Sequence, residues 1–215
     1  MDMIMSNNEM YTRVINDVLN SGILDLGNSM YEKDKKTFRH CQRVFDHCFL
    51  IGLKLSLTIM EFECLAIAAF YHDVGDIEIP DTILDKAGAF ANAEKTVMET
   101  HPRISANMLR LAGGSEDAVK TLACHHERYD GKGHPYGLHG ENIPLLARIL
   151  AVADAYDSMT SKTGVMKTIK NEEAIDRLML SSGTLFDPEV AGSLIKQIET
   201  SHMCRLGTDE KVEVA

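Results

Sequence analysis

The sequence has few cysteines, no excess of positive charge and no long apolar run. Its five cysteines are odd in number and include no C-x-x-C pair, which favours a reducing, cytoplasmic compartment with the thiols as small core residues. Acidic residues outnumber basic residues 32 to 22, and the net charge of −10 argues against a surface for duplex nucleic acid or anionic membranes. No signal peptide or membrane-spanning segment is visible, because polar residues interrupt the apolar stretch near the N-terminus.

The length and composition indicate one compact soluble domain with short appendages. The chain has 215 residues, of which 45% are hydrophobic and 25% are charged. Both proportions are ordinary for a globular protein, and a chain of this length buries a core without disulfide or metal support. We expect a leading helix over residues 1–28, a main domain over 29–201 and a charged tail over 202–215.

Hydrophobic periodicity predicts an all-α fold. Apolar residues recur at spacings of three and four in most segments, and no segment alternates as a strand does. Gly113-Gly114 ends one predicted helix and Ser115 caps the next. Beyond the leading segment, we predict helices over residues 38–55, 62–70, 94–112, from 115 onward, 145–160, 172–180 and 188–200.

Histidines and aspartates are concentrated in a few segments that precede or follow apolar runs. Seven of the nine histidines lie between His40 and His134. Imidazole and carboxylate groups are ligands for divalent ions, and facing helices of a bundle can bring such ligands together. Two ions held close together can promote an in-line displacement at phosphorus. The candidate ligands are His40, His72, Asp73, His101, His125, His126 and Asp154.

Each of these residues also has a purely structural interpretation. Asp73 alone would serve as a helix cap, and Asp154 alone would pair with Arg148. We expect His47 to be a hydrogen-bonded core residue, and His139 and His202 to lie in solvated loops. Taken together, the structural interpretation weakens, because apolar segments lead directly into His72-Asp73 and Asp154, where a buried charge is costly without a partner.

The order and spacing of these residues resemble the HD-GYP subgroup of the HD phosphohydrolase superfamily. The resemblance covers residues 37–198 and implies an all-α bundle with a metal centre in its core. It rests on His40-Cys41-Gln42-Arg43-Val44, His72-Asp73-Val74-Gly75, Ile79-Pro80, Ile83-Leu84, Glu94, His101-Pro102, His125-His126-Glu127, Asp130-Gly131, Gly133, Gly137-Leu138, Ile143-Pro144, Arg148-Ile149, Asp154 and Phe186-Asp187-Pro188.

The resemblance also assigns roles to the ligands. One metal ion would be held by His40, His72, Asp73 and Asp154, and Asp73 would bridge to a second ion held by His101, His125 and His126. His72 and Asp73 would thereby act in catalysis. Similar proteins use iron or manganese, and some bind a third ion through an acid one turn before the first histidine. Lys36 occupies that position here, which favours two ions.

The sequence departs from the family pattern where substrate would bind. Gly133-His134-Pro135 replaces Gly-Tyr-Pro, and His134 would either stay in solvent or reach the site. Asp76 replaces a lysine that resembles a phosphate contact, and it would repel phosphate, bind metal, cap a turn or remain solvated. Residues 163–166 read Thr-Gly-Val-Met where the family carries Arg-Pro-Tyr-Arg, leaving Lys162 and Lys167 as point charges.

The resemblance implies a metal-dependent phosphodiesterase that opens cyclic di-GMP. Lys132 is a candidate phosphate contact, and Asp157, three residues after Asp154, is a candidate to orient a ligand histidine. One alternative is a non-catalytic module that binds a nucleotide or a partner protein and keeps the metal centre. The other is a hydrolase of a different cyclic dinucleotide or phosphate ester. Regulation would come through the N-terminal helix, a homodimer or a separate partner.

Overall fold

The fold is described from a computed structural model that covers residues 6–19, 23–84, 86, 88–161 and 168–209. The described residues form helices and one isolated β-bridge but no β-strand, which confirms the predicted all-α class. The elements are α1 (Asn7–Leu19), α2 (Leu24–Lys33), α3 (Lys35–Lys54), α4 (Ile59–Tyr71), η1 (Val74–Glu78), α5 (Asp81–Leu84), α6 (Asn92–Met98), α7 (His101–Leu111), α8 (Glu116–Cys124), η2 (Gly140–Asn142), α9 (Leu145–Thr160), α10 (Asn171–Ser181) and α11 (Pro188–Asp209).

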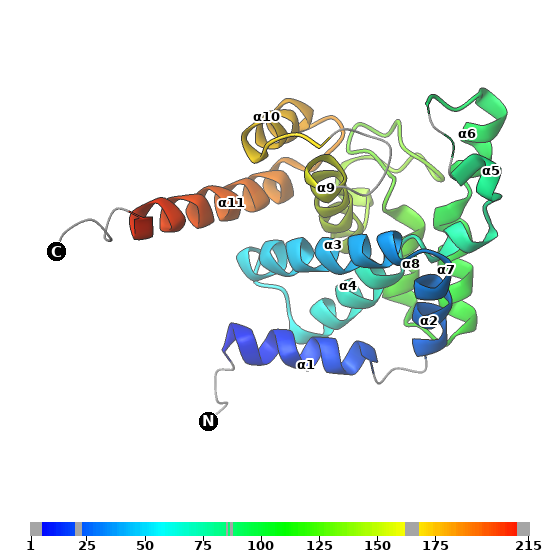
Figure 1. Cartoon of the computed structure of the whole chain (residues 1–215), viewed down its shortest axis with the longest axis horizontal. Helices are drawn as coiled ribbons and strands as arrows, with labels where there is room; N and C mark the ends of the chain where they lie inside the picture. Colours follow the sequence, from blue (N-terminus) through cyan, green and yellow to red (C-terminus); the bar gives the residue numbers. More distant parts are fainter. Residues whose placement is uncertain (1–5, 20–22, 85, 87, 162–167, 210–215) are drawn as a thin grey trace.

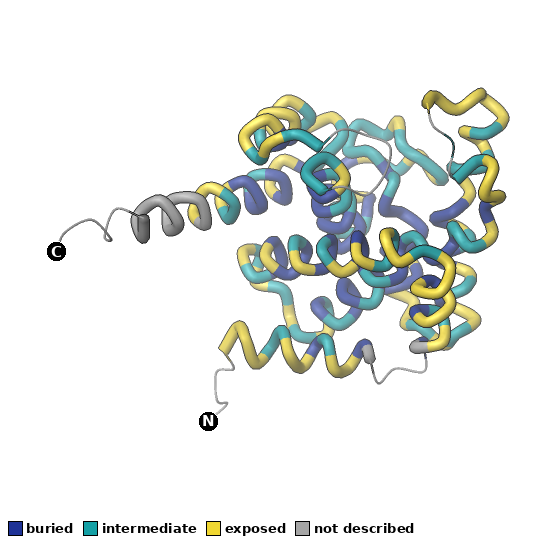
Figure 2. The backbone as a smooth tube through the Cα atoms, viewed as in Figure 1, coloured by how far each residue is buried: buried dark blue, intermediate teal, exposed yellow. Residues whose placement is uncertain are grey.

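Helices α3 and α4 form the centre of the bundle. Helix α3 packs on α4 and α9, α4 also contacts α8, and α7 lies against η1 and α8. Figure 1 shows α1 running along α4, with α2 at the end of α3. The buried segments in Figure 2 concentrate in the same central helices. Five helices therefore meet around one interior region.

Local sequence explains where the central helices begin. Asp34 accepts a hydrogen bond from the Lys36 backbone N–H at 2.8 Å and starts α3. Thr58 and Glu61 form a reciprocal capping box at the start of α4. Ser115 caps α8, as predicted. These caps set the boundaries of the helices that carry the candidate ligands.

Two predicted helices are each divided in the structure. The leading segment contains α1 and the start of α2, which continues to Lys33, rather than one helix over residues 1–28. The helix predicted over 94–112 is divided into α6 and α7. Pro102 has no backbone N–H to continue a helix and stands instead in the first turn of α7. This break puts His101 at a helix start.

Helix α11 is longer than predicted. It continues past Thr200 to Asp209, into the segment expected to be a tail. No glycine or proline interrupts residues 195–206, so the backbone has no reason to leave the helix at Thr200.

The described cysteines behave as the composition predicted. Cys41, Cys48, Cys64 and Cys124 are buried and unpaired, and the side chain of Cys204 lies outside the described residues. Within the described residues, no helix has both the length and the apolar character needed to cross a membrane.

Candidate metal centre

The candidate ligands come from five helices and meet inside the bundle. His40 lies within α3, His72 and Asp73 directly follow α4, and His101 is the first residue of α7. His125 and His126 follow α8, and Asp154 lies within α9. Helix ends are suitable positions, because a side chain there can reach beyond its own helix into the space between others.

One group of ligand atoms surrounds the first half of this space. The ligand atoms of His40, His72 and Asp73 lie within 4.8 Å of one another. Nε2 of His72 is 3.2 Å from Oδ2 of Asp73, and Nε2 of His40 is 3.8 Å from the same oxygen. Oδ1 of Asp154 is 3.1 Å from Nε2 of His40 and adds a second carboxylate to the group.

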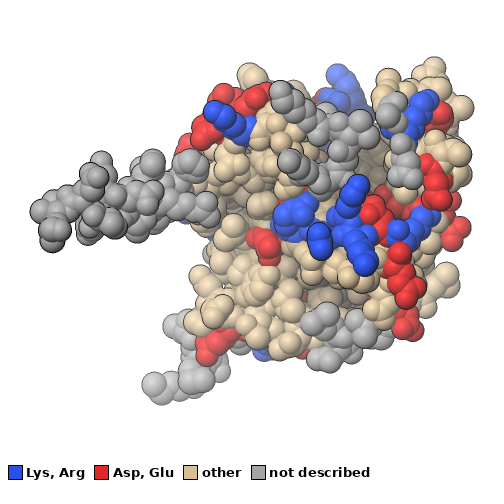
Figure 3. Space-filling model, viewed as in Figure 1, with Lys and Arg blue, Asp and Glu red and all other residues tan. Residues whose placement is uncertain are grey.

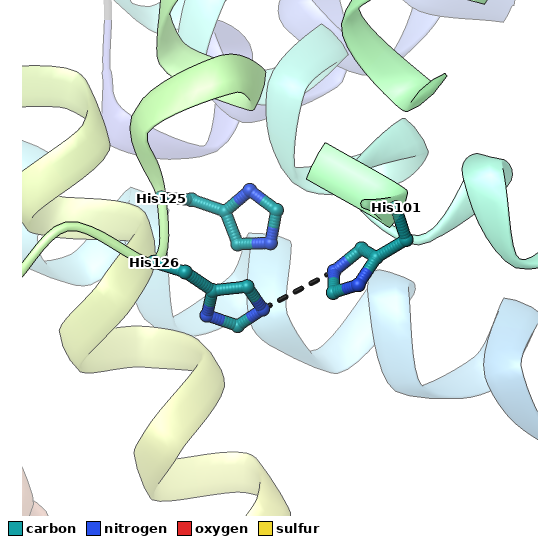
Figure 4. Close-up of side chains that lie close together, drawn as sticks. All are labelled: His101, His125 and His126. Atoms are coloured by element: carbon teal, nitrogen blue, oxygen red, sulfur yellow. Dashed lines mark hydrogen bonds between the residues drawn. The ribbon is translucent and has the colours of Figure 1, made fainter. Parts of the chain in front are cut away.

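A second group consists of three histidines. The ligand atoms of His101, His125 and His126 also lie within 4.8 Å of one another. Figure 4 shows the three rings turned toward one another, two from the segment after α8 and one from the start of α7. Nε2 of His126 and Nε2 of His101 are 3.1 Å apart. This geometry offers several nitrogen donors to one small space.

Asp73 lies between the two groups. Its Oδ2 faces His40 and His72, whereas its Oδ1 is 3.7 Å from Nε2 of His101. One carboxylate therefore presents one oxygen to each group. A carboxylate in this position can bridge two divalent ions.

Three of the histidines have the same tautomer. In each, Nδ1 lies within hydrogen-bond distance of the backbone carbonyl three residues earlier. The pairs are His72 with Ala69 at 2.9 Å, His101 with Met98 at 2.8 Å and His125 with Leu122 at 2.7 Å. A carbonyl oxygen only accepts, so Nδ1 carries the proton and donates. In the neutral ring, Nε2 then presents its lone pair to the cluster.

Two of these Nε2 atoms lack hydrogen-bond partners among the described residues. Nε2 of His72 and Nε2 of His125 are buried and have no hydrogen-bond partner among the described residues. Nε2 of His72 lies 3.2 Å from the Asp73 carboxylate and, although burial opposes this, the carboxylate raises the pKa of His72. Buried polar nitrogens without a hydrogen-bond partner are unfavourable, and a cation bound beside them would remove this cost. The arrangement therefore fits divalent metal ions held by imidazole and carboxylate ligands.

The pKa shifts differ between the two groups. Burial and the neighbouring histidines hold the pKa of His125 well below its usual range and lower the pKa of His126 to about 4. Both rings are therefore neutral near pH 7, as metal ligation requires. Although burial opposes ionisation, His72 and the other nearby histidines hold the pKa of Asp73 well below its usual range, so Asp73 is a carboxylate.

A buried carboxylate supports His40 from the side away from the ligand atoms. Oδ2 of Asp157 is 2.7 Å from Nδ1 of His40. Asp157 also accepts hydrogen bonds from Nε and Nη2 of Arg43 at 2.7 and 2.9 Å, and from Ser161 at 2.9 Å. Asp157 therefore lies where it can orient His40. Arg43, whose part in this arrangement the sequence analysis did not identify, lies three residues after His40 on the same helix.

Other histidines and arginines are outside both groups. Arg148 pairs with Asp187, so it is not the partner of Asp154. His47 packs its ring 4.9 Å from that of Tyr156, and its Nε2 is 3.9 Å from Asp157. His139 is exposed. The side chain of His202 lies outside the described residues.

His134, which the sequence placed either in solvent or at the site, is partly buried beside the second group. It is half-buried, with its ring 5.3 Å from the ring of His126, and its Nδ1 is buried without a hydrogen-bond partner among the described residues. The loop is held by Glu127, which accepts hydrogen bonds from the backbone N–H groups of Tyr136 and Leu138 at 2.6 and 3.0 Å. Gly133 approaches the backbone of this segment so closely that a Cβ would lie 2.2 Å from Arg128 N. Packing of this loop therefore draws His134 inward.

Asp76 is also more buried than a solvated loop acid. Its Oδ1 is buried and has no hydrogen-bond partner among the described residues. Burial and the charge of Asp73 raise the pKa of Asp76 to about 8. Lys33 lies nearby, but its ammonium donates to the Ile77 carbonyl at 2.7 Å and pairs with Asp81 at 3.5 Å. The carboxyl group of Asp76 thus stands beside the cluster without a compensating ion pair.

The lysines considered from the sequence lie at the surface or outside the described residues. Lys36 is exposed on α3. Lys132 is exposed in its loop, where its backbone N–H donates to Asp130, and no contact in the described part of the chain joins its ammonium to either ligand group. The segment 162–167, which contains Lys162, Lys167 and the altered residues 163–166, lies outside the described residues.

Ser105 is a supporting residue that the sequence analysis missed. Its Oγ donates to the His72 carbonyl at 2.7 Å and accepts from the Gly75 N–H at 2.8 Å. A Cβ on Gly75 would lie 2.5 Å from the His101 carbonyl oxygen. The turn after α4 and the start of α7 are therefore packed in direct contact, which positions His72 and His101 together. Residues thirty positions apart carry no spacing signal for such a contact.

Comparison with known proteins identifies the family. Residues 28–190 match the family described as HD domain. The chain belongs to the HD domain family. This membership and the relatives below confirm the resemblance recognised from the motifs. The matched residues of this HD domain protein include His72 and Asp73.

Two curated relatives and one solved structure illustrate the similarity. The cyclic di-GMP phosphodiesterase response regulator RpfG of Xanthomonas campestris is 36% identical over 173 residues, covering 80% of this chain and 46% of the relative. The 3'3'-cGAMP-specific phosphodiesterase 2 of Vibrio cholerae is 30% identical over 176 residues, covering 81% and 34%. An HDG"Y"P protein from Bdellovibrio bacteriovorus has a TM-score of 0.63 at 19% identity, covering 75% and 52%, and shares the fold. The chain spans less than half the length of these two curated relatives.

Proposed function

We propose that this HD domain protein is a metal-dependent phosphodiesterase whose substrate is a cyclic dinucleotide. The observation that carries the proposal is the position of Asp73 between two groups of ligands. Relatives named as phosphodiesterases of cyclic di-GMP and of 3'3'-cGAMP support the substrate class. Two divalent ions, iron or manganese, are the proposed cofactors.

The proposed ligands divide into two sets with one shared member. His40, His72, Asp73 and Asp154 would hold one ion, and His101, His125 and His126 would hold the other with Asp73 between them. When bound, the pair of ions would lower the pKa of a water molecule and neutralise charge on the phosphoryl oxygens. His72 and Asp73 are catalytic in this proposal because they hold the reacting centre.

The residues around the ligands would orient the ligand histidines and exclude water from the site. The three carbonyl contacts would direct Nε2 of these histidines toward bound ions, and Asp157 would do the same for His40. Buried rings keep water from competing at the inner side of the site, since His72 and His125 are almost fully enclosed. Lys132 remains the proposed phosphate contact from the sequence, to be tested by substitution.

Asp76 is the feature that favours the second candidate function. A carboxyl group beside the cluster, at the family's lysine position, opposes binding of a phosphate when it is ionised. A protein that binds a nucleotide or partner and keeps its metal ions without turnover would tolerate this change. A hydrolase for a different cyclic dinucleotide or phosphate ester is the third candidate.

Product analysis distinguishes these candidates. Protein loaded with iron or manganese under anaerobic conditions would be incubated with cyclic di-GMP and, in parallel, with 3'3'-cGAMP. We expect a linear dinucleotide or mononucleotides from one of them, and none from the His72→Ala variant. Bound metal with no product from either substrate would contradict the proposal and favour a binding module. An Asp76→Lys variant that gains activity would identify Asp76 as the cause.

A further inference from the structure

A cavity separate from the metal ligands lies between α1, α2, α3 and α4. Its volume is about 730 Å³, and none of the seven proposed ligands lines it. Pockets that bind small molecules have volumes of roughly 300–1,000 Å³. Its lining residues come from all four helices, and in Figure 1 α1 and α2 flank the α3–α4 pair. The cavity therefore has the size of a ligand site of its own.

The α3 wall of the cavity carries polar side chains in one stripe. Arg39, Gln42, Arg43 and Asp46 are spaced by three and four residues, which places them on one face of the helix. Arg39 is exposed and has no ion-pair partner among the described residues. On a chain with a net charge of −10, Figure 3 shows Lys and Arg side chains gathered over α3. This wall is suited to an anion.

The facing walls are aromatic. Tyr11 of α1, Tyr31 of α2 and Phe70 at the end of α4 all line the cavity. Aromatic side chains provide stacking surfaces for nucleobases, and arginine guanidinium groups bind phosphate through paired N–H donors. A cavity that combines both groups matches a ligand with a planar ring at one end and a phosphate at the other.

We propose that this cavity binds a purine nucleoside monophosphate at a site distinct from the metal centre. The phosphate would lie at Arg39 and Arg43. The base would lie toward Asp46, which by helical rise is about 10 Å along α3 from Arg39 and about 4.5 Å from Arg43. Oδ1 of Asp46 accepts a hydrogen bond from Tyr11 at 2.6 Å, and its second oxygen would accept from an N–H group of the base. The proposal goes beyond phosphodiester hydrolysis and does not depend on turnover.

Arg43 connects this site to the metal centre. Its side chain is 36% exposed and lines the cavity, while its Nε and Nη2 donate to Asp157. Asp157 in turn contacts Nδ1 of His40 at 2.7 Å. Nη1 of Arg43 makes neither of these two hydrogen bonds, so it would donate to a phosphate in the cavity while Arg43 stays paired with Asp157. A bound nucleotide would thus hold Arg43 and Asp157 in the positions that orient His40. Metal binding would then be stronger.

Calorimetric titration of GMP into metal-free protein tests the site. We expect saturable binding with one GMP per chain, weakened tenfold or more by Arg39→Gln because a charge-assisted hydrogen bond is lost. Arg110→Gln on α7, an exposed arginine away from the cavity, is the matched control and should leave the affinity unchanged. Absence of saturable binding, or equal affinities of Arg39→Gln and the unaltered protein, would overturn the proposal.

Two further measurements separate this site from the proposed active site. The His72→Ala variant should bind GMP as the unaltered protein does, and loss of GMP binding there would place the ligand at the metal centre and refute the proposal. Saturating GMP should tighten Mn²⁺ binding by about fivefold or more, and Mn²⁺ should tighten GMP binding by the same factor. Arg43→Lys, which loses the guanidinium fork, should abolish this coupling. A coupling factor of one in the unaltered protein would refute the connection.

Discussion

Oδ2 of Asp157 lies 2.7 Å from Nδ1 of His40, and Arg43 holds the same carboxylate through two hydrogen bonds. Although burial opposes both effects, this contact contributes to raising the pKa of His40 to about 10 and to lowering the pKa of Asp157 to about 2. A carboxylate behind a ligand histidine fixes its tautomer and increases its basicity. The relationship joins α3 to α9 across the bundle.

Removal of the Asp157 carboxylate should weaken metal binding. We expect Asp157→Ala to lower the affinity for Mn²⁺ by roughly 10–100-fold, because His40 loses the group that orients it. Calorimetric titration of the metal-free protein with Mn²⁺ measures the change. Asp176→Ala on α10, where the aspartate is exposed, is the control. An unaltered affinity in a folded Asp157→Ala variant would show that the contact does not support the metal centre.

Substitution of the shared ligand Asp73 should remove more metal than substitution of His125, which belongs to one group. Because Asp73 faces both groups, Asp73→Ala should remove most of the bound metal, whereas His125→Ala should leave one of the two proposed ions in place. Elemental analysis of protein purified with manganese gives the metal content per chain. His139→Ala, in an exposed loop position, should retain the full content. Equal losses in the two ligand variants would contradict the division into two groups.

Asp76 should make the stability of the metal-free protein depend on pH. Burial and Asp73 raise its pKa from 3.8 to about 8 in the folded state, so the folded protein holds a proton that the unfolded chain has released between those values. Stability should therefore fall as pH rises from about 4 to about 8, by at most about 1.4 kcal/mol per pH unit from this group.

Asp76→Asn removes this dependence. Its free energy of unfolding should exceed that of the unaltered protein by an amount that grows with pH and levels off above about pH 8. Urea denaturation with a chelator at several pH values provides the comparison, with Asp176→Asn as the exposed control. A difference that stays constant from pH 5 to pH 8 would mean that Asp76 keeps an ordinary pKa.

Gly75 should tolerate no side chain. A Cβ there would lie 2.5 Å from the His101 carbonyl and 2.8 Å from Ser105 Oγ, so Gly75→Ala should destabilise the fold by about 1–3 kcal/mol. Metal affinity should fall as well, because the start of α7 would be displaced. Gly192→Ala in α11 is the matched control: its Cβ meets nothing within 4 Å, and it should stabilise the protein by up to about 1 kcal/mol. Urea denaturation distinguishes the two substitutions.

The sequence by itself determined the all-α class, most helices and the resemblance to HD domain proteins. These follow from local periodicity, caps and motif spacing, which depend on residues close together in the chain. The candidate ligands and Asp157 were also chosen from the sequence, and their roles remain predictions. The boundary between α6 and α7 was missed because apolar periodicity continues across it, although Pro102 carried the signal.

The tertiary structure decided which atoms face one another. Local spacing places Arg43 one turn from His40, but only the packing of α3 on α9 brings both to Asp157. Likewise, the sequence left open whether Asp76 and His134 stay solvated, and the folded turns partly bury both. Burial and through-space distance depend on helices far apart in sequence, and these contacts set the charge state of the site.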